Sequence, residues 1–197
     1  MERRLVLASG NPGKLREFQA LLAPLEYRVH PQREFGVDDV EETGLTFVEN
    51  ALLKARHACR ISGLPALADD SGLAVDALQG APGIYSARYA GEPRSDAANN
   101  RKLIEALAEV PEGQRTARYW CVLVWLRHEH DPVPRIVQAS WRGEILAQPR
   151  GEGGFGYDPL FWLPEQGLTA AELDAAEKNR LSHRGRALRT LVESLGS

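Results

Sequence analysis

The sequence has few cysteines and no long hydrophobic run. Cys59 and Cys121 are its two cysteines, and two cysteines cannot form a disulfide scaffold, so we expect both to be buried thiols. No apolar run approaches the roughly 20 residues of a membrane span or the roughly 7–15 of a secretory signal. These absences predict a cytoplasmic protein with no membrane partner.

The chain also lacks an excess of either charge. It has 24 lysines and arginines against 27 aspartates and glutamates, a formal net charge of −3. Proteins that bind nucleic acid usually carry a basic excess, so we do not expect nucleic acid as a partner. Hydrophobic residues make up 43% of the chain, enough to bury a core without metal or disulfide. We expect a single domain over residues 1–197.

Hydrophobic periodicity predicts helices that alternate with strands, followed by a long pair of strands. Helices are expected after the caps Asn11, Thr46 and Ser95, after a capping box at Thr169, and around Leu188. Strands are expected at residues 4–8, 27–30, 64–68, 116–126 and 135–146, the last two as an antiparallel pair. This order predicts a mixed α/β sheet rather than a purely parallel one.

A polar segment follows the first predicted strand and opens a helix; it consists of Ser9, Gly10, Asn11, Pro12, Gly13 and Lys14. Small residues let a ligand approach the backbone, the helix start offers free amides, and Lys14 adds a positive charge. The segment therefore has the character of a phosphate-binding loop, although its spacing is not that of a Walker A motif. A capped helix with a solvent lysine is the alternative. Lys54, on the next helix, is either a surface lysine or a second phosphate ligand.

Acidic residues occur at two places that suit a metal. Residues 69–72 read Asp-Asp-Ser-Gly, and we expect this segment to end a strand. Neighbouring acids on a strand point to opposite faces, so one of Asp69 and Asp70 should face a given site. Carboxylates suit Mg²⁺, although this segment is also ordinary turn chemistry. Glu41 and Glu42 form a solvated loop unless the fold brings them beside Asp70.

The C-terminal part holds an aromatic residue and polar donors. Phe155 lies between glycines in residues 151–158, which would expose its ring as a stacking surface for a base, with burial in the core as the alternative. His183 and Arg184 supply hydrogen-bond donors at an expected helix start, or else are solvent charges. Together with the phosphate loop and the acids, these residues predict a nucleoside triphosphate site.

The same segments resemble the inosine/xanthosine triphosphate pyrophosphatase family, whose members remove non-canonical purine nucleotides. The resemblance is carried by SGNPGK at 9–14, EETG at 41–44, ENA at 49–51 with KA at 54–55, ADDSGL at 68–73, APGIYSAR at 81–88, GGFGYDP at 153–159 and SHR at 182–184. These segments follow the family's order and spread over nearly the whole chain. Ser9 stands where many members carry threonine, which keeps the hydroxyl.

The resemblance implies a fold and an activity. The fold would be α/β, with an elongated, mixed, twisted sheet and flanking helices, in which two lobes enclose a central nucleotide cleft. The family is typically homodimeric. The activity would be Mg²⁺-dependent hydrolysis of ITP, dITP and XTP between the α- and β-phosphates, which yields a nucleoside monophosphate and pyrophosphate.

The resemblance also implies roles for individual residues. Asp70 would be the proton acceptor and a Mg²⁺ ligand, Glu41 the second ligand, and residues 9–14 the triphosphate site. The other substrate-binding residues would be Lys54, Ser71, Phe155, Gly156, Tyr157, Asp158, Lys178, His183 and Arg184. Since His183 and Arg184 are donors, they would pair with a 6-oxo purine and reject the 6-amino group of adenine. These residues do not explain how guanine is refused.

Two alternatives remain at this point. One is a nucleoside triphosphate pyrophosphatase with a different base preference, which a substrate panel would identify. The other is a nucleotide-binding or RNA-binding module without turnover, which Mg²⁺-independent binding would support. The acids at 41, 69 and 70 favour an enzyme, because carboxylates near phosphate repel it unless a cation lies between them.

Overall fold

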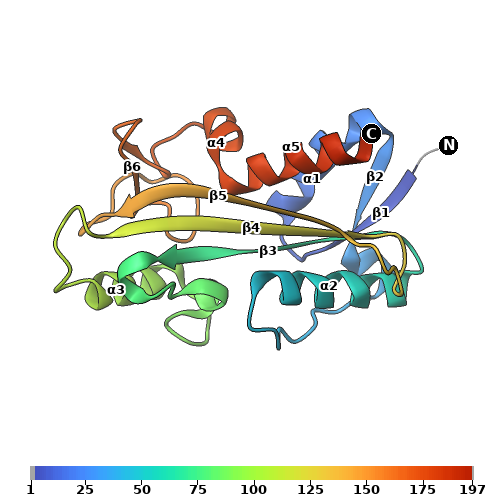
Figure 1. Ribbon diagram of the computed structural model, residues 1–197, viewed down its shortest axis with the longest axis horizontal. Helices are drawn as coiled ribbons and strands as arrows, with labels where there is room; N and C mark the ends of the chain where they lie inside the picture. Colours follow the sequence, from blue (N-terminus) through green and yellow to red (C-terminus); the bar gives the residue numbers. More distant parts are fainter. Residues whose placement is uncertain (1–2, 197) are drawn as a thin grey trace. The chain divides into compact units, whose positions relative to one another are not determined.

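The computed structural model describes residues 3–196 and is built on a seven-stranded sheet in the order β2-β1-β3-β4-β5-β6-β7 (Figure 1). The strands are β1 (Arg3–Ala8), β2 (Tyr27–Pro31), β3 (Ala66–Val75), β4 (Thr116–Leu126), β5 (Arg135–Ile145), β6 (Phe161–Leu163) and β7 (Leu168–Thr169). The α-helices are α1 (Pro12–Leu22), α2 (Phe47–Ser62), α3 (Asp96–Ala106), α4 (Ala175–Leu181) and α5 (His183–Gly196). Short 3₁₀ helices occupy Ala23–Leu25, Gln32–Phe35, Asp76–Leu78 and Gly83–Arg88.

The sheet is mixed, as predicted. β1 pairs in parallel with β2 and β3, whereas β6 pairs antiparallel with β5 and β7. β4 and β5 are neighbours joined by residues 127–134 alone. A connection this short joins antiparallel strands, because a parallel crossover needs about a dozen residues or more. The predicted strand pair is therefore confirmed.

Polar side chains set the helix starts that the sequence predicts. Asn11 caps α1 by accepting two amides of its first turn. Thr46 caps α2 by accepting the amide of Glu49, whose carboxylate reaches back to the Thr46 hydroxyl. Ser95 caps α3 by accepting the amide of Ala98. These three predicted helix starts are confirmed.

The prediction that a strand ends at the Asp-Asp-Ser-Gly segment is wrong. β3 runs from Ala66 to Val75 without interruption and contains residues 69–72. A turn of this composition depends on aspartate side chains that bond to nearby backbone. Here the carboxylates of Asp69 and Asp70 accept lysine side chains instead, so they do not draw the chain into a turn.

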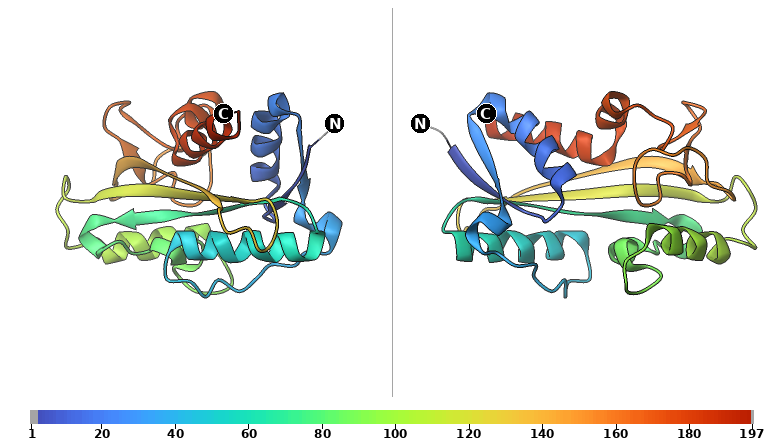
Figure 2. Two further views of the ribbon diagram at one scale, coloured as in Figure 1. Left: turned by 45° about the vertical axis from the view of Figure 1, so that its right-hand side comes forward. Right: turned by 180° about the vertical axis from the view of Figure 1, so that it is seen from behind.

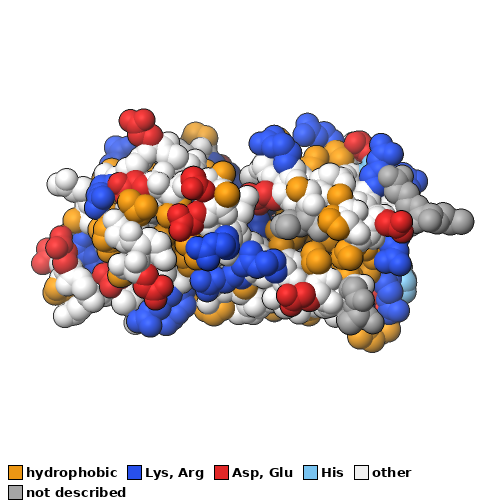
Figure 3. All heavy atoms as spheres, turned by 90° about the horizontal axis from the view of Figure 1, so that it is seen from above, with side chains coloured by type: hydrophobic (Ala, Val, Ile, Leu, Met, Phe, Trp, Pro, Cys, Tyr) orange, Lys and Arg blue, Asp and Glu red, His pale blue; other side chains and the backbone are white. Residues whose placement is uncertain are grey.

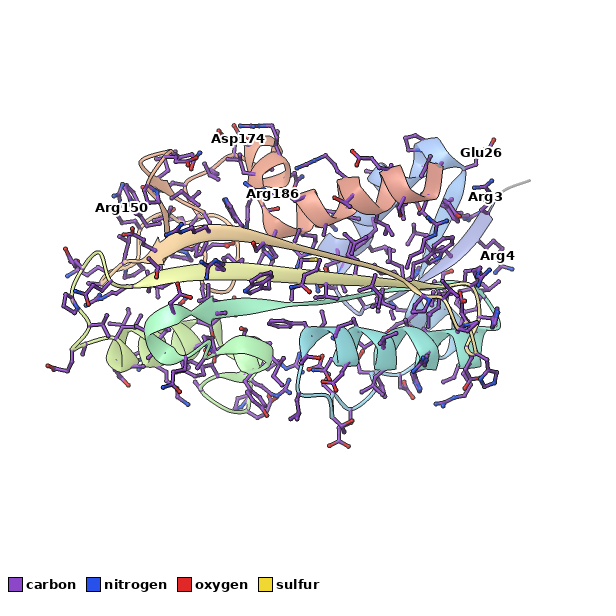
Figure 4. All side chains as sticks on the ribbon, in the orientation of Figure 1. Arg3, Arg4, Glu26, Arg150, Asp174 and Arg186 are labelled. Carbon is purple, nitrogen blue, oxygen red and sulfur yellow. The ribbon has the colours of Figure 1, made fainter. Side chains whose placement is uncertain are left out.

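The helix start predicted at Thr169 is also wrong. The Glu172 carboxylate does reach back to the Thr169 amide, at 2.8 Å, as in a capping box. However, Thr169 belongs to β7, and its hydroxyl donates to the carbonyl of Arg150, so it cannot cap a helix. α4 begins later, next to Asp174, which is labelled in Figure 4. The Asp174 side chain accepts the amide of Glu177.

The chain divides into two compact units. Among the described residues, unit 1 comprises 3–70, 121–139 and 186–196, and unit 2 comprises 71–120 and 140–185. The boundaries fall inside β3, β4, β5 and α5. Each unit has a hydrophobic core of its own.

In unit 1, helices cover both faces of the strands. α1 and α5 pack over Leu5 and Leu7 of β1, while α2 packs over Val6 and Ala8. Figures 1 and 2 show α1 and α2 on opposite sides of β1. Because side chains alternate along a strand, each residue of β3 in this unit faces one helix or the other.

In unit 2, aromatic residues from several strands form the core. Tyr119 of β4, Trp141 of β5 and Phe161 of β6 pack together with Leu103 of α3. The ring centroids of Tyr119 and Phe161 are 4.6 Å apart. Burial of apolar surface stabilises the folded state by about 25 cal/mol per Å². These buried rings therefore stabilise the part of unit 2 from which its loops extend.

The surface carries both charges and a few large apolar side chains. On the face in Figure 3, basic and acidic side chains both occur. Within residues 3–196, no helix combines the length and the apolar character that crossing a membrane requires. Cys59 and Cys121 are buried thiols, as predicted.

Candidate active site

The loop between β1 and α1 satisfies its own amides. The Ser9 hydroxyl accepts the Asn11 amide at 3.2 Å, and Asn11 Oδ1 accepts the amides of Gly13 at 2.8 Å and Lys14 at 3.2 Å. The amides that the sequence led us to expect as free are therefore occupied. A phosphate would reach them only after the Asn11 side chain turns away.

Lys14 is held by Asp69. Its Nζ lies 2.9 Å from Asp69 Oδ1, and the side chains are 18% and 0% exposed. The Cys121 thiol lies 3.8 Å from the other carboxylate oxygen of Asp69. Lys14 is thus not a solvent lysine, because a buried acid holds its ammonium near the start of α1.

Lys54 joins two acids on the other face of β3. Its Nζ lies 2.5 Å from Glu42 Oε1 and 2.6 Å from Asp70 Oδ1. The fold therefore brings the acidic loop that contains Glu41 and Glu42 beside Asp70. This proximity is what the sequence analysis required before giving the loop a functional role. The carboxylate that arrives is Glu42, whereas Glu41 is exposed. Asp69 and Asp70 face different helices, as the strand alternation predicts.

Burial and neighbouring charges shift the pKa values of Asp70 and Lys54. Burial raises the pKa of Asp70 to about 6, and the nearby Lys54 charge limits the rise. Burial lowers the pKa of Lys54, but the charges of Asp70 and Glu42 outweigh it and hold that pKa above its ordinary value. Burial thus favours the protonated form of Asp70 more than that of an ordinary carboxylate, while Lys54 stays charged.

Asn50 positions the acidic loop, a role that the sequence analysis did not assign. It is fully buried, and its Oδ1 accepts the Gly44 amide at 2.8 Å. A Cβ on Gly44 would come within 2.7 Å of that oxygen, so glycine permits the contact. Asn50 lies one helical turn before Lys54, and this spacing was the available sequence signal.

Glu42 and Asp70 suit a divalent cation that also binds substrate. Both carboxylates reach one ammonium, so they converge on one point, and oxygen donors are what Mg²⁺ takes. Within residues 3–196, no group of three or more His, Cys, Asp or Glu side chains could hold a metal. The arrangement fits a cation that draws its other ligands from phosphates and water.

In unit 2, Phe155 presents its ring to solvent. Its exposed fraction is 57%, which confirms the predicted exposure. The Lys178 ammonium lies 4.9 Å from the ring centroid, and the Arg184 guanidinium carbon lies 6.0 Å from it. A ring with cations beside it suits a planar, electron-rich ligand such as a nucleobase.

Asp158 organises the loop that carries Phe155. It is buried and accepts the Phe155 amide at 2.8 Å and the Lys178 ammonium at 2.5 Å. Gly154 has a φ of +75°, and a Cβ there would overlap the Asp158 carboxylate. Glycine at 154 is therefore required by both the backbone and the close approach.

α3 holds the same loop from another side. Asp96 accepts the Gly156 amide at 2.7 Å, and Asn100 donates to the Gly156 carbonyl at 2.9 Å. Tyr157 is buried, and its hydroxyl donates to the Ser86 carbonyl at 2.7 Å. Gly156 and Tyr157 thus serve the loop's shape here, and nothing in the sequence pattern pointed to α3.

His183 and Arg184 begin α5, as predicted, but they are not solvent charges. Each is 8% exposed. The His183 ring stacks on Tyr119, with centroids 4.8 Å apart and planes 9° from parallel. The Ser182 hydroxyl accepts the Gly185 amide at 3.2 Å and so supports the helix start.

The predicted residues divide between the units. Those of the phosphate loop, Glu41, Lys54 and Asp70 lie in unit 1, and the others, from Ser71 to Arg184, lie in unit 2. Ser71 is half-buried on β3. A separate hollow of about 460 Å³ in unit 1, lined by Gln19, Ala23, Glu26, Tyr27 and Arg28, contains none of them.

Two neighbouring carboxylates of β3 that each hold a lysine of a helix, and an exposed ring flanked by cations, are typical of a nucleotide-processing class of α/β protein. The Ham1 family model matches residues 5–194. The chain belongs to this family, and the resemblance found in the sequence is confirmed at the family level.

Known relatives match the chain over almost its whole length. It is 64% identical to a dITP/XTP pyrophosphatase of Xanthomonas axonopodis pv. citri (strain 306), covering 98% of this chain and 97% of the relative. It is 58% identical to a dITP/XTP pyrophosphatase of Shigella flexneri, covering 98% of each. The solved structure of a HAM1 protein from Coxiella burnetii is 52% identical, with a TM-score of 0.95 and 98% of each chain covered.

Proposed function

We propose that this chain hydrolyses dITP, XTP and ITP between the α- and β-phosphates, releasing pyrophosphate and a nucleoside monophosphate. The observation that carries the proposal is the near full-length identity of 58–64% to proteins named dITP/XTP pyrophosphatase. The structure supports it through residues suited to phosphate in unit 1 and to a base in unit 2. We also propose that residues 1–197 act as one two-lobed domain.

On the phosphate side, two ammonium groups are already held in place. Lys14 is kept by Asp69, and Lys54 is kept by Glu42 and Asp70. Phosphoryl chemistry depends on positioning and charge neutralisation, and lysines held by acids lose little freedom when phosphate arrives. Ser9 and Asn11 would add a hydroxyl and an amide, once their bonds within the loop are released.

Asp70 would accept the proton of the attacking water. The water oxygen bonds to phosphorus, the α–β bridging bond breaks, and pyrophosphate leaves. Mg²⁺, when bound, supplies neutralisation of phosphate charge and lowers the pKa of water. Asp70 and Glu42 would hold it, since Glu42 is the acid that reaches Lys54, whereas the resemblance assigned this role to Glu41. Lys54 would then turn to the phosphates.

On the base side, Phe155 would stack on the purine. Lys178 lies beside the ring, and His183 and Arg184 would donate to the 6-oxo group of hypoxanthine or xanthine. Adenine carries a 6-amino group, which would leave these donors unpaired. A site of this kind rejects such an analogue by roughly 10⁴-fold or more.

The enzyme would act in the cytoplasm, where nucleotide pools lie. Its partners would be purine nucleoside triphosphates and a second copy of itself, without nucleic acid or membrane.

The test is release of pyrophosphate from ITP, dITP, XTP, GTP and ATP, with Mg²⁺ and with EDTA. We expect Mg²⁺-dependent release from the first three and little from GTP and ATP. Release of orthophosphate would place the cut at another bond, and preference for a different base would change the substrate class. A folded protein without turnover would instead be a nucleotide-binding module.

A further inference from the structure

We propose that Tyr119 is a positioning residue that sets base specificity by holding the imidazole plane of His183. This inference rests on the proposed function. Tyr119 belongs to β4 and lies far in sequence from Phe155 and His183. Its role would be to orient the His183 side chain rather than to touch the substrate.

The contact is a parallel stack. The two ring centroids lie 4.8 Å apart, the planes differ by 9°, and both residues are 8% exposed. The ring N–H bonds of histidine lie in the ring plane, so the plane determines where a proton can be donated. A stacked partner therefore limits the directions in which His183 can point.

Tyr119 is in turn held by the sheet. Its ring packs on Phe161 at 4.6 Å, and Phe161 packs on Trp141 at 5.3 Å. These rings come from β4, β6 and β5, whereas His183 is the first residue of α5. The stack thus connects a helix terminus, where backbone bonds are fewest, to the aromatic core of unit 2.

The ring of Tyr119, more than its hydroxyl, makes the connection. The hydroxyl lies 3.4 Å from Asp158 Oδ1, at the long limit of a hydrogen bond. Asp158 already accepts the Phe155 amide and the Lys178 ammonium at shorter distances. Burial and the Asp158 charge also raise the pKa of Tyr119 well above its ordinary value, so the hydroxyl stays neutral.

Holding the plane matters because the hydrogen bonds of an imidazole are directional. A ring that tilts out of this plane no longer aims its N–H at the 6-oxo group and discriminates less against the 6-amino group of adenine. A ring held in this plane keeps the donor directed at the 6-oxo group. Loss of the stack should therefore weaken the preference for ITP over ATP more than it weakens turnover of ITP.

The experiment compares kcat/KM for ITP and ATP, with Mg²⁺, in wild type, Tyr119→Leu and Tyr119→Phe. We expect the ITP/ATP ratio to fall by at least about 10-fold in Tyr119→Leu and to stay within about 2-fold of wild type in Tyr119→Phe. An unchanged ratio in a folded Tyr119→Leu protein overturns the inference. A large fall in Tyr119→Phe also overturns it, because the hydroxyl would then be responsible.

Leu107→Ala is the matched control, since it loosens the same core at a buried residue outside the ring contacts of Tyr119, Phe161 and Trp141. An equal fall in the ratio there would show general loosening and contradict a specific role for Tyr119. If Tyr119→Leu does not fold, Tyr119→Met fills the space without a planar face and replaces it. A wild-type protein that releases no pyrophosphate from ITP contradicts the proposed function itself, a result separate from any change in the ratio.

Discussion

Asp69 and Asp70 are chemically identical neighbours with different surroundings. Asp69 is sealed from solvent and holds Lys14 of α1, whereas Asp70 meets Lys54 of α2 together with Glu42. The difference follows from strand alternation, which sends one carboxylate to each face. Asp70 thus lies beside a second carboxylate, an arrangement that suits a metal ligand.

Asp70→Asn should lose turnover of ITP by about 10²–10⁴-fold, because the amide cannot accept the proton. The fold should persist, since the side chain keeps its size. The measurement is kcat with Mg²⁺, alongside thermal unfolding. Asp76→Asn is the control, because Asp76 accepts hydrogen bonds from Thr116 and Arg118 and is not assigned to the site. Near wild-type turnover in Asp70→Asn would remove Asp70 from the chemistry.

Asn11→Asp separates capping from phosphate binding. Aspartate caps helices as well as asparagine, so the free energy of unfolding should stay near that of wild type. A carboxylate against the triphosphate should raise KM for ITP by about 10-fold through charge repulsion. Asn11→Ser, a neutral cap, should leave KM closer to that of wild type. An unchanged KM in Asn11→Asp would mean that the triphosphate binds elsewhere.

At the scale of elements, one buried acid, Asp131, stabilises the loop of residues 127–134 that connects β4 and β5. Asp131 accepts the Arg127 side chain at 2.8 and 2.6 Å, and the amides of Arg127 and Val133 at 3.0 and 3.1 Å. These bonds, led by the Arg127 side chain, hold the pKa of Asp131 well below its ordinary value. The loop is therefore stabilised by an ionised carboxylate.

Its contribution to stability should depend on pH. A carboxyl whose pKa is lowered by folding stabilises the protein above its unfolded pKa near 4, and this stability is lost as pH falls further. Asp131→Asn should thus lower the free energy of unfolding at pH 7. The difference in this free energy between the variant and wild type should become smaller toward pH 3. Urea titrations at both pH values measure this. A gap that is the same at both would contradict the ionised role.

Elements with local signals were predictable, and those set by tertiary contacts were not. The caps Asn11, Thr46 and Ser95 act within their own helix turn, so their patterns were sufficient. Thr169 carried a similar pattern, but β7 pairing overrode it. The ion pair between Glu42 and Lys54 depends on a loop without periodicity and on where α2 places Lys54, which no local pattern contains.

For the whole molecule, the family followed from motifs spread along the chain, and the mixed sheet followed from the order of the predicted helices and strands. The burial of His183 and Arg184 did not, because their contacts come from distant parts of unit 2. A tyrosine in a strand, such as Tyr119, looks like ordinary core until its neighbour is known.

The whole molecule should also be a homodimer, an expectation that comes from the resemblance. Light scattering coupled to size exclusion should give about twice the chain mass of 21.8 kDa. The value should hold on dilution through the range used for kinetics. A mass of 21.8 kDa that persists at high concentration would contradict the dimer.

The alternation along β3 has a consequence for how this protein can change over evolutionary time. Inserting or deleting one residue within β3, upstream of the acids, would swap the faces of Asp69 and Asp70 and give each the other's lysine. The protein can accommodate substitutions around the two acids one at a time. Once Asp69 and Asp70 have exchanged their lysine partners, however, no single substitution restores the original pairs. Changes of length should therefore accumulate in loops such as residues 127–134, while β3 keeps its length across descendants.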